Sequence, residues 1–137
     1  MKKAIRALSL IGVTFLVVSV ALAQGVYTGL IIDAKDLSFN PSASPKILDE
    51  EGREIYGSAF LDKDWVEKHG VVGYAKSLTE AKLNSRVAGN PYVVNAIKVT
   101  GPNSKDLIVS NADAQKIREF AENLNFLDQA KVIIIVP

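Results

Sequence analysis

The sequence predicts an α+β fold: a mixed β-sheet, made of hairpins and a C-terminal β-α-β unit, with two main helices packed on it. Candidate hairpins over residues 46–56 and 92–109 require antiparallel strand pairs. A strand–helix–strand order over residues 107–137 requires a parallel pair joined by a right-handed crossover. Because both kinds of pairing are expected in one short chain, we predict a sheet that mixes them.

The chain has 137 residues, which suits one modest domain. Residues 1–23 have the pattern of a cleavable signal peptide: a basic start, an uncharged apolar run over residues 7–20, and small residues at 21 and 23. The alternative is an uncleaved membrane anchor, but the apolar run is shorter than the roughly 20 residues that a spanning helix needs. We therefore predict a single α+β domain over residues 24–137, periplasmic or secreted, without a membrane span after cleavage.

Charge and cysteine content exclude several classes of partner and chemistry. The full chain has a formal net charge of +1, and removing the positive charges of Lys2, Lys3 and Arg6 with the signal peptide leaves −2. A near-neutral domain without a basic run is a poor partner for nucleic acid or for anionic membranes. The cysteine count is zero, which excludes disulfides, thiolate nucleophiles and cysteine metal sites.

Residues 26–33 are the predicted central strand, because the middle of both alternating faces is apolar. Gly29 leaves one face bare, so we expect another segment to pack closely there. A proline-containing loop follows, and then a hairpin over residues 46–56 with Gly52 at a positive φ. Its acidic tip, residues 49–51, is interpreted as solvated turn residues. A cation site is the less favoured interpretation, since the spacing of an EF-hand is absent.

Two helical segments are expected in the middle of the chain. Asp62 is a candidate N-cap and Gly70 a candidate stop for a short helix, whose Trp65 we expect to anchor it on the sheet. A capping box over residues 77–80 predicts a second helix as far as residue 88, ended by Gly89, Asn90 and Pro91. Leu83 and Val87 are predicted to lie on its buried face.

The C-terminal third contains the clearest signals. Residues 92–100 are predicted to form a strand, residues 101–104 a turn, and residues 107–109 the hairpin partner. Residues 111–124 carry an apolar stripe at helical spacing, with Ser110 or Asn111 as the cap. Residues 131–137 are apolar on both faces and predict a buried strand.

Few residues suggest catalysis. His69 is the only histidine, and a position at the end of a helix explains it better than a catalytic or zinc role. Asp33, Lys35 and Asp36 follow the central strand, where sheet enzymes often carry catalytic groups. The alternative interpretation is thus a small envelope hydrolase using Asp33 or Asp36, helped by Lys35 or Arg53. Polar residues also suit any strand exit, so we expect no catalytic centre, cofactor or metal.

Three segments, residues 27–34, 44–57 and 106–114, resemble domains of bacterial envelope proteins grouped with the flagellar assembly protein T and P families and related outer-membrane lipoproteins. The resemblance implies a non-enzymatic periplasmic or outer-membrane-associated accessory protein, part of a ring or other assembly. Its expected partners are other envelope proteins or further copies of itself. The chain lacks the acylated cysteine of the lipoproteins, so it would be soluble in the periplasm or held by partners. The resemblance transfers no functional residues.

Overall fold

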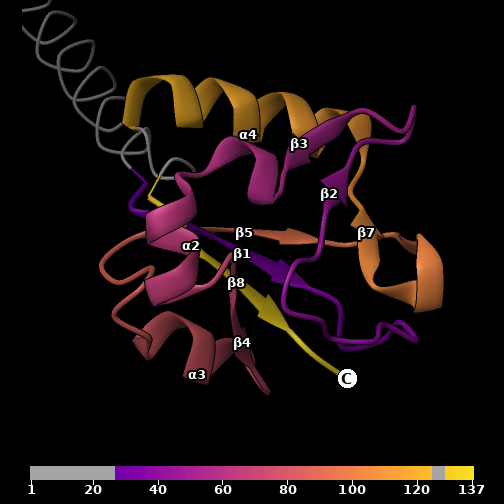
Figure 1. Ribbon diagram of the computed structural model, residues 1–137, viewed down its shortest axis with the longest axis horizontal. Helices are drawn as coiled ribbons and strands as arrows, with labels where there is room; N and C mark the ends of the chain where they lie inside the picture. The colour runs from indigo at the N-terminus through magenta and orange to yellow at the C-terminus, as the bar shows by residue number, and fades with distance from the viewer. Residues whose placement is uncertain (1–26, 125–128) are drawn as a thin grey trace, which may run out of the picture.

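The computed structural model describes residues 27–124 and 129–137, so the predicted signal peptide lies outside the described residues. The strands form two sheets (Figure 1). The first has the order β4-β8-β1-β5 and is parallel throughout. Its strands are β1 (Gly29–Asp33), β4 (Gly73–Ala75), β5 (Pro91–Asn95) and β8 (Val132–Ile135).

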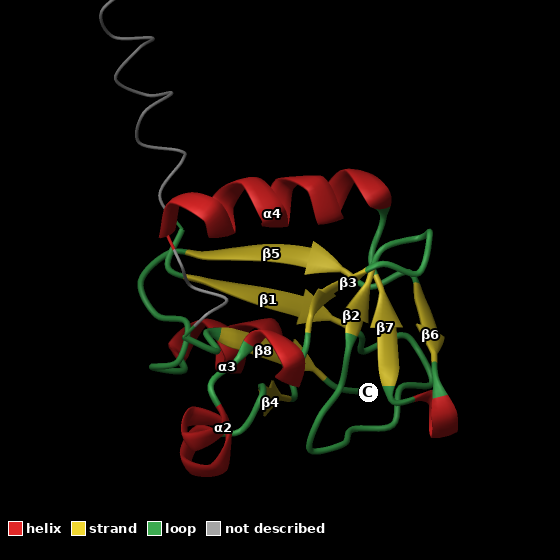
Figure 2. Cartoon of the chain, turned by 45° about the horizontal axis from the view of Figure 1, so that its top comes forward, coloured by secondary structure: helices red, strands yellow, loops and turns green. Residues whose placement is uncertain are grey.

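The second sheet has the order β3-β2-β7-β6 and mixes both kinds of pairing. Antiparallel pairs join β2 to β3 and β6 to β7, and β2 lies parallel to β7. In Figure 2 its strands run across the direction of the first sheet. The strands are β2 (Ile47–Leu48), β3 (Glu54–Tyr56), β6 (Lys98–Thr100) and β7 (Asp106–Ile108).

Three α-helices and two short 3-10 turns complete the described chain. The longest, α4 (Asn111–Leu124), and the short α3 (Leu78–Leu83) lie on opposite sides of the first sheet (Figure 2). The third helix, α2 (Lys63–His69), lies near α3, and the 3-10 turns are η1 (Ser58–Phe60) and η2 (Pro102–Ser104). The α+β class is therefore confirmed, in two sheets.

The predicted C-terminal β-α-β unit is wrong, because β7 and β8 belong to different sheets. The chain changes sheet at the end of β5. The amide of Ala96 donates to Asp33 of the first sheet at 3.0 Å, and the next amide, of Ile97, donates to Ile108 of the second at 2.8 Å. This switch divides the predicted strand 92–100 into β5 and β6. Only β6 forms the expected hairpin with β7, while β5 pairs with β1.

The core confirms that β1 and β8 are covered on both faces. Leu30 and Ile32 pack with Val132, Ile134 and residues of α4 and the second sheet. Ile31 instead faces a smaller cluster beneath α3, completed by Ala75, Ala81, Val87, Ile133 and Ile135. The bare face of Gly29 is filled as expected, since an added Cβ would lie only 2.8 Å from the Cβ of Val87.

The helix α3 begins as predicted and ends early. The amide of Glu80 donates to the Ser77 hydroxyl, 3.1 Å away, while the Glu80 carboxylate accepts from the amide of Lys76. The helix stops at Leu83 because the side chain of Asn84 accepts the Arg86 amide and turns the chain. The turn brings Val87 into the core but leaves Leu83 79% exposed, so the prediction that Leu83 is buried is wrong.

Candidate functional site

The helix α2 forms one wall of a cleft. Asp62 caps its start by accepting from the Asp64 amide at 3.2 Å, and Gly70 ends it with a φ of 73°. Both helix limits agree with the prediction. Because Trp65 and His69 are four positions apart, they lie on one side of the helix. Their rings stack with centroids 4.0 Å apart and an interplanar angle of 23°.

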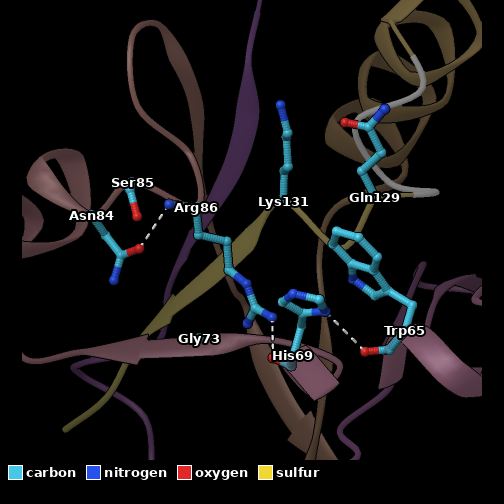
Figure 3. A pocket seen from close by; sticks show the side chains of 8 residues that line it. All are labelled: Trp65, His69, Gly73, Asn84, Ser85, Arg86, Gln129 and Lys131. Atoms are coloured by element: carbon cyan, nitrogen blue, oxygen red, sulfur yellow. Dashed lines mark hydrogen bonds between the residues drawn. The ribbon is translucent and has the colours of Figure 1, made fainter. Parts of the chain in front are cut away.

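The sequence predicted that Trp65 anchors α2 on the sheet, but the residue stays 38% exposed and belongs to neither core cluster of the described residues. His69 ends the helix as predicted, and its Nδ1 lies 3.3 Å from the Trp65 carbonyl oxygen. Between them the two rings present a partly exposed aromatic surface to the cleft (Figure 3).

The opposite wall is the turn that ends α3. Arg86 reaches from this turn to the end of α2, where its Nη2 donates to the carbonyl of His69 and, at 3.2 Å, to that of Gly70. These carbonyls carry the negative end of the helix dipole, so a guanidinium suits this position. Burial lowers the pKa of Arg86, while the nearby Tyr56 acts to raise it.

The floor lies at the amino ends of two parallel strands. Gly73 is the first residue of β4, and Lys131 comes directly before β8. Packing around Gly73 is close: an added Cβ would lie 2.5 Å from Cδ1 at the flexible end of Ile133 and 3.4 Å from Nη1 of Arg86. We call this feature the α2 cleft; its volume is about 470 Å³, and it is lined by Trp65, His69, Gly73, Asn84, Ser85, Arg86, Gln129 and Lys131.

The lining of the α2 cleft is rich in hydrogen-bond donors. It contains the charged groups of Arg86 and Lys131, one imidazole, one hydroxyl and two amides, and no carboxylate of a described residue. Such a lining can hold a negatively charged group. Sequence reasoning missed Arg86 and Lys131, because they come from separate turns that no local pattern connects.

The residues proposed for hydrolysis come together only in part. Asp33, Lys35 and Asp36 share a hollow of about 310 Å³ with Asn95 and with Leu37 and Ala96. It lies at the carboxyl ends of β1 and β5, where ligands bind in many parallel sheets. Asp33 accepts the Lys35 amide at 3.0 Å, which explains its presence at a strand exit.

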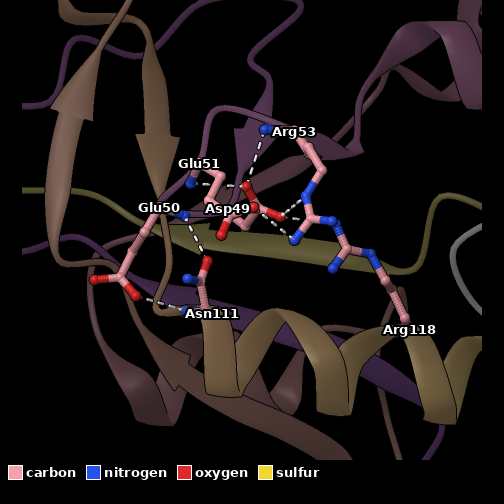
Figure 4. Close-up of polar contacts among 6 residues, drawn as sticks. All are labelled: Asp49, Glu50, Glu51, Arg53, Asn111 and Arg118. Carbon is pink, nitrogen blue, oxygen red and sulfur yellow. Dashed lines mark hydrogen bonds and ion pairs between the residues drawn. The ribbon is translucent and has the colours of Figure 1, made fainter.

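Arg53 does not line this hollow and so does not join the other three. Its Nε instead donates to Asp49 at 2.8 Å, and its Nη2 lies 3.2 Å from Glu51 (Figure 4). Gly52 takes the expected positive φ of 83° at the tip of this hairpin.

Asp49 corrects the interpretation of the acidic tip. Glu50 and Glu51 are exposed, but the side chain of Asp49 has 0% exposure. Burial works to raise the pKa of Asp49, yet hydrogen bonds from the Arg53 amide, the Arg118 and Arg53 guanidinium groups and the Glu51 amide lower it to about 2. Because α4 and the turn supply every one of these donors, the carboxylate has a structural role.

Within residues 27–124 and 129–137, no group of three or more histidine, cysteine, aspartate or glutamate side chains is placed to hold a metal ion. In the same residues, no helix has the length and apolar character needed to cross a membrane.

Residues 29–137 match the family model described as the second domain of Treponema pallidum Tp0624. A search of the curated proteins gives no match to the chain. The family match covers every strand and helix described above.

Proposed function

We propose, from the premise that this chain belongs to the family of the Treponema pallidum Tp0624 second domain, that it is an exported, non-enzymatic binding module of the bacterial cell envelope. The α2 cleft is its binding site. The observation that carries the proposal is the composition of this cleft, in which cationic and amide groups surround a partly exposed indole. Concave sites in which polar groups converge beside an aromatic wall are typical ligand sites.

A catalytic use of the same cleft has less support. A histidine that acts as a base needs a nucleophile within hydrogen-bond reach and a group that orients its ring. Among the described residues, the His69 imidazole has only the Trp65 carbonyl as a hydrogen-bond partner and the indole as a stacking partner. This arrangement favours binding over nucleophilic chemistry.

Export and assembly complete the proposal. The signal-peptide pattern of residues 1–23 supports a periplasmic or secreted location. The resemblance of residues 27–34, 44–57 and 106–114 to flagellar assembly proteins T and P supports the finer proposal of an accessory part in an envelope assembly. Its partners are other envelope proteins or further copies of the chain.

Site-specific crosslinking in intact cells tests the proposal. A photo-crosslinking amino acid replaces Ser85, which is exposed and lines the cleft. A matched control carries it at Lys116, an exposed position on α4. We expect light-dependent adducts with an envelope component at position 85 and not at position 116. Equal adducts at both positions, or none at position 85, contradict the proposed site.

The second candidate function is a small envelope hydrolase. It has one specific observation in its favour, the shared hollow of Asp33, Lys35 and Asp36 at the carboxyl ends of β1 and β5. The double variant Asp33→Asn/Asp36→Asn keeps an oxygen that can accept the Lys35 amide. If the hypothesis holds, the purified chain degrades cell-wall material, and the variant loses this activity at an unchanged Tm. A purified chain that degrades none rules the hydrolase out.

A further inference from the structure

The positive groups of the α2 cleft are only partly used within the protein. The Nη2 of Arg86 donates to the backbone carbonyls at the end of α2. The other N–H groups of its guanidinium have no hydrogen-bond partner among the described residues. Lys131 likewise forms no ion pair with a carboxylate in the described part of the chain. Because unpaired donors around a concave surface attract negative charge, they define a place for an anion.

The aromatic wall adds a second recognition element. One face of the Trp65 indole stacks on His69, and the residue as a whole remains 38% exposed. Figure 3 shows the indole beside the imidazole, with Arg86 across the cleft and Lys131 at another side. An exposed indole surface next to cations suits a ligand that has a flat apolar part beside its charge.

We propose that the α2 cleft binds a small organic anion, with its oxyanion at the guanidinium N–H groups of Arg86 that α2 does not use, its flat apolar part against Trp65, and the positive charge of Lys131 at another side of the cleft. This inference rests on the proposed function, since it names the ligand class of the same site. The volume of about 470 Å³ lies within the range of small-molecule sites. Two cationic side chains without a basic run fit a single charged group rather than a nucleic acid strand.

The sequence provides the reporter for the test. Trp65 is the only tryptophan, so the intrinsic tryptophan fluorescence of the purified full-length chain reports on the cleft alone. The probes are benzoate, phenyl phosphate and the neutral isostere benzamide. Benzoate and phenyl phosphate should change the fluorescence saturably, with a Kd of about 1–10 mM for ligands of so few atoms. Benzamide should bind at least tenfold more weakly.

The two anions distinguish the source of the charge. A lower Kd for benzoate assigns the site to carboxylates, and a lower Kd for phenyl phosphate assigns it to phosphate esters. Either result supports an anion site. An equal response to benzamide and benzoate, or no saturable response to any probe, overturns the inference.

Two variants connect the signal to the proposed contacts. Lys131→Met keeps the apolar stem and the backbone carbonyl, which accepts the Leu30 amide at 2.9 Å, and removes only the charge. It should raise the Kd for benzoate several-fold, as expected for the loss of one positive charge that lines the cleft. Lys116→Met on α4 removes an equal charge away from the cleft and should leave the Kd unchanged. An unchanged Kd in Lys131→Met contradicts the inference.

The outcomes also separate this inference from the function it rests on. If position 85 gives crosslinks but the chain binds no anion, the proposed anion site is wrong and the proposed binding module stands. If position 85 gives no crosslinks but the chain binds benzoate specifically, the anion site stands and the proposed envelope partner at this cleft is wrong.

Discussion

The carboxylate Oδ2 of Asp49 lies 3.0 Å from Nη2 of Arg118, although the two residues are 69 positions apart. The same oxygen accepts from Nε of Arg53 at 2.8 Å. Beside this contact, Glu50 and Asn111 exchange two hydrogen bonds, each between one residue's backbone amide and the other's side-chain oxygen. These contacts fix the β2–β3 hairpin to the start of α4 (Figure 4).

Replacing the buried carboxylate should therefore destabilise the whole domain. In Asp49→Asn, a side-chain amide with donors of its own faces the guanidinium groups of Arg53 and Arg118, which lose their charged partner. We expect calorimetry to show a Tm decrease several times that of Glu51→Gln. Glu51 is the matched control, because it forms an exposed pair with Arg53, and such pairs contribute only about 0–1 kcal/mol. Equal Tm decreases in the two variants would show that the buried contacts of Asp49 contribute no more to stability than the exposed pair does.

The same carboxylate should give the domain an acid-sensitive component of stability. The pKa of Asp49 is about 2 in the folded chain, below its ordinary value of 3.8. Because the folded state favours the ionised form, this stabilisation is complete above pH 3.8 and is lost as the pH falls toward 2.

Urea unfolding of the wild type and Asp49→Asn from pH 2 to pH 7 measures this component. The difference in unfolding free energy between the two proteins should be constant well above pH 3.8 and shrink below it. A difference that stays constant to the lowest pH would assign the acid sensitivity to other carboxylates.

Gly29 should tolerate no side chain. An added Cβ would lie 2.8 Å from Cβ and 2.9 Å from Cα of Val87, and these atoms can move only with the backbone. We expect Gly29→Ala to lower the unfolding free energy by about 1–3 kcal/mol, as overpacking of a core does. Gly73→Ala is the comparison, since its closest contact is the flexible end of Ile133 at 2.5 Å. Denaturant unfolding should show a smaller loss for Gly73→Ala, and the reverse order would contradict this account.

Elements with strong local signals could be predicted from sequence. The bounds of α4 match the predicted residues 111–124, and the Ser110 hydroxyl accepts the Asp113 amide at 3.0 Å as a cap should. The two-faced apolar strands β1 and β8 are buried as expected. In each case the residues that determine the structure lie within the element itself.

Arrangements set by distant residues could not be predicted in this way. The passage from one sheet to the other rests on single hydrogen bonds from Ala96 and Ile97, within a run of residues that looks like one strand. The α2 cleft likewise combines the end of one helix with turns before β5 and β8. Asp49 was misjudged because its partner Arg118 lies on another element. Of the candidate hydrolase residues, Arg53 was misplaced because its guanidinium pairs with Asp49 and Glu51 of its own hairpin.

Tyr56 should make the domain sensitive to alkaline pH. Its side chain is fully buried, and its hydroxyl donates to the Val71 carbonyl at 2.5 Å. Burial raises the pKa of Tyr56 above the ordinary value of 10.0, although Arg86 acts to lower it. Since the folded state favours the protonated form, this stabilisation is complete below pH 10 and is lost as the pH rises above it.

Tyr56→Phe tests both consequences. At neutral pH the variant leaves the buried Val71 carbonyl without its donor, so it should lose about 1–3 kcal/mol of unfolding free energy. Above pH 10, its stability should fall less steeply with pH than that of the wild type, because one titrating group is gone. Some slope should remain, since burial also raises the pKa of Tyr74 and of Tyr92. Urea midpoints measured on both sides of pH 10 provide the comparison, and parallel curves for the two proteins would exclude Tyr56 as the source.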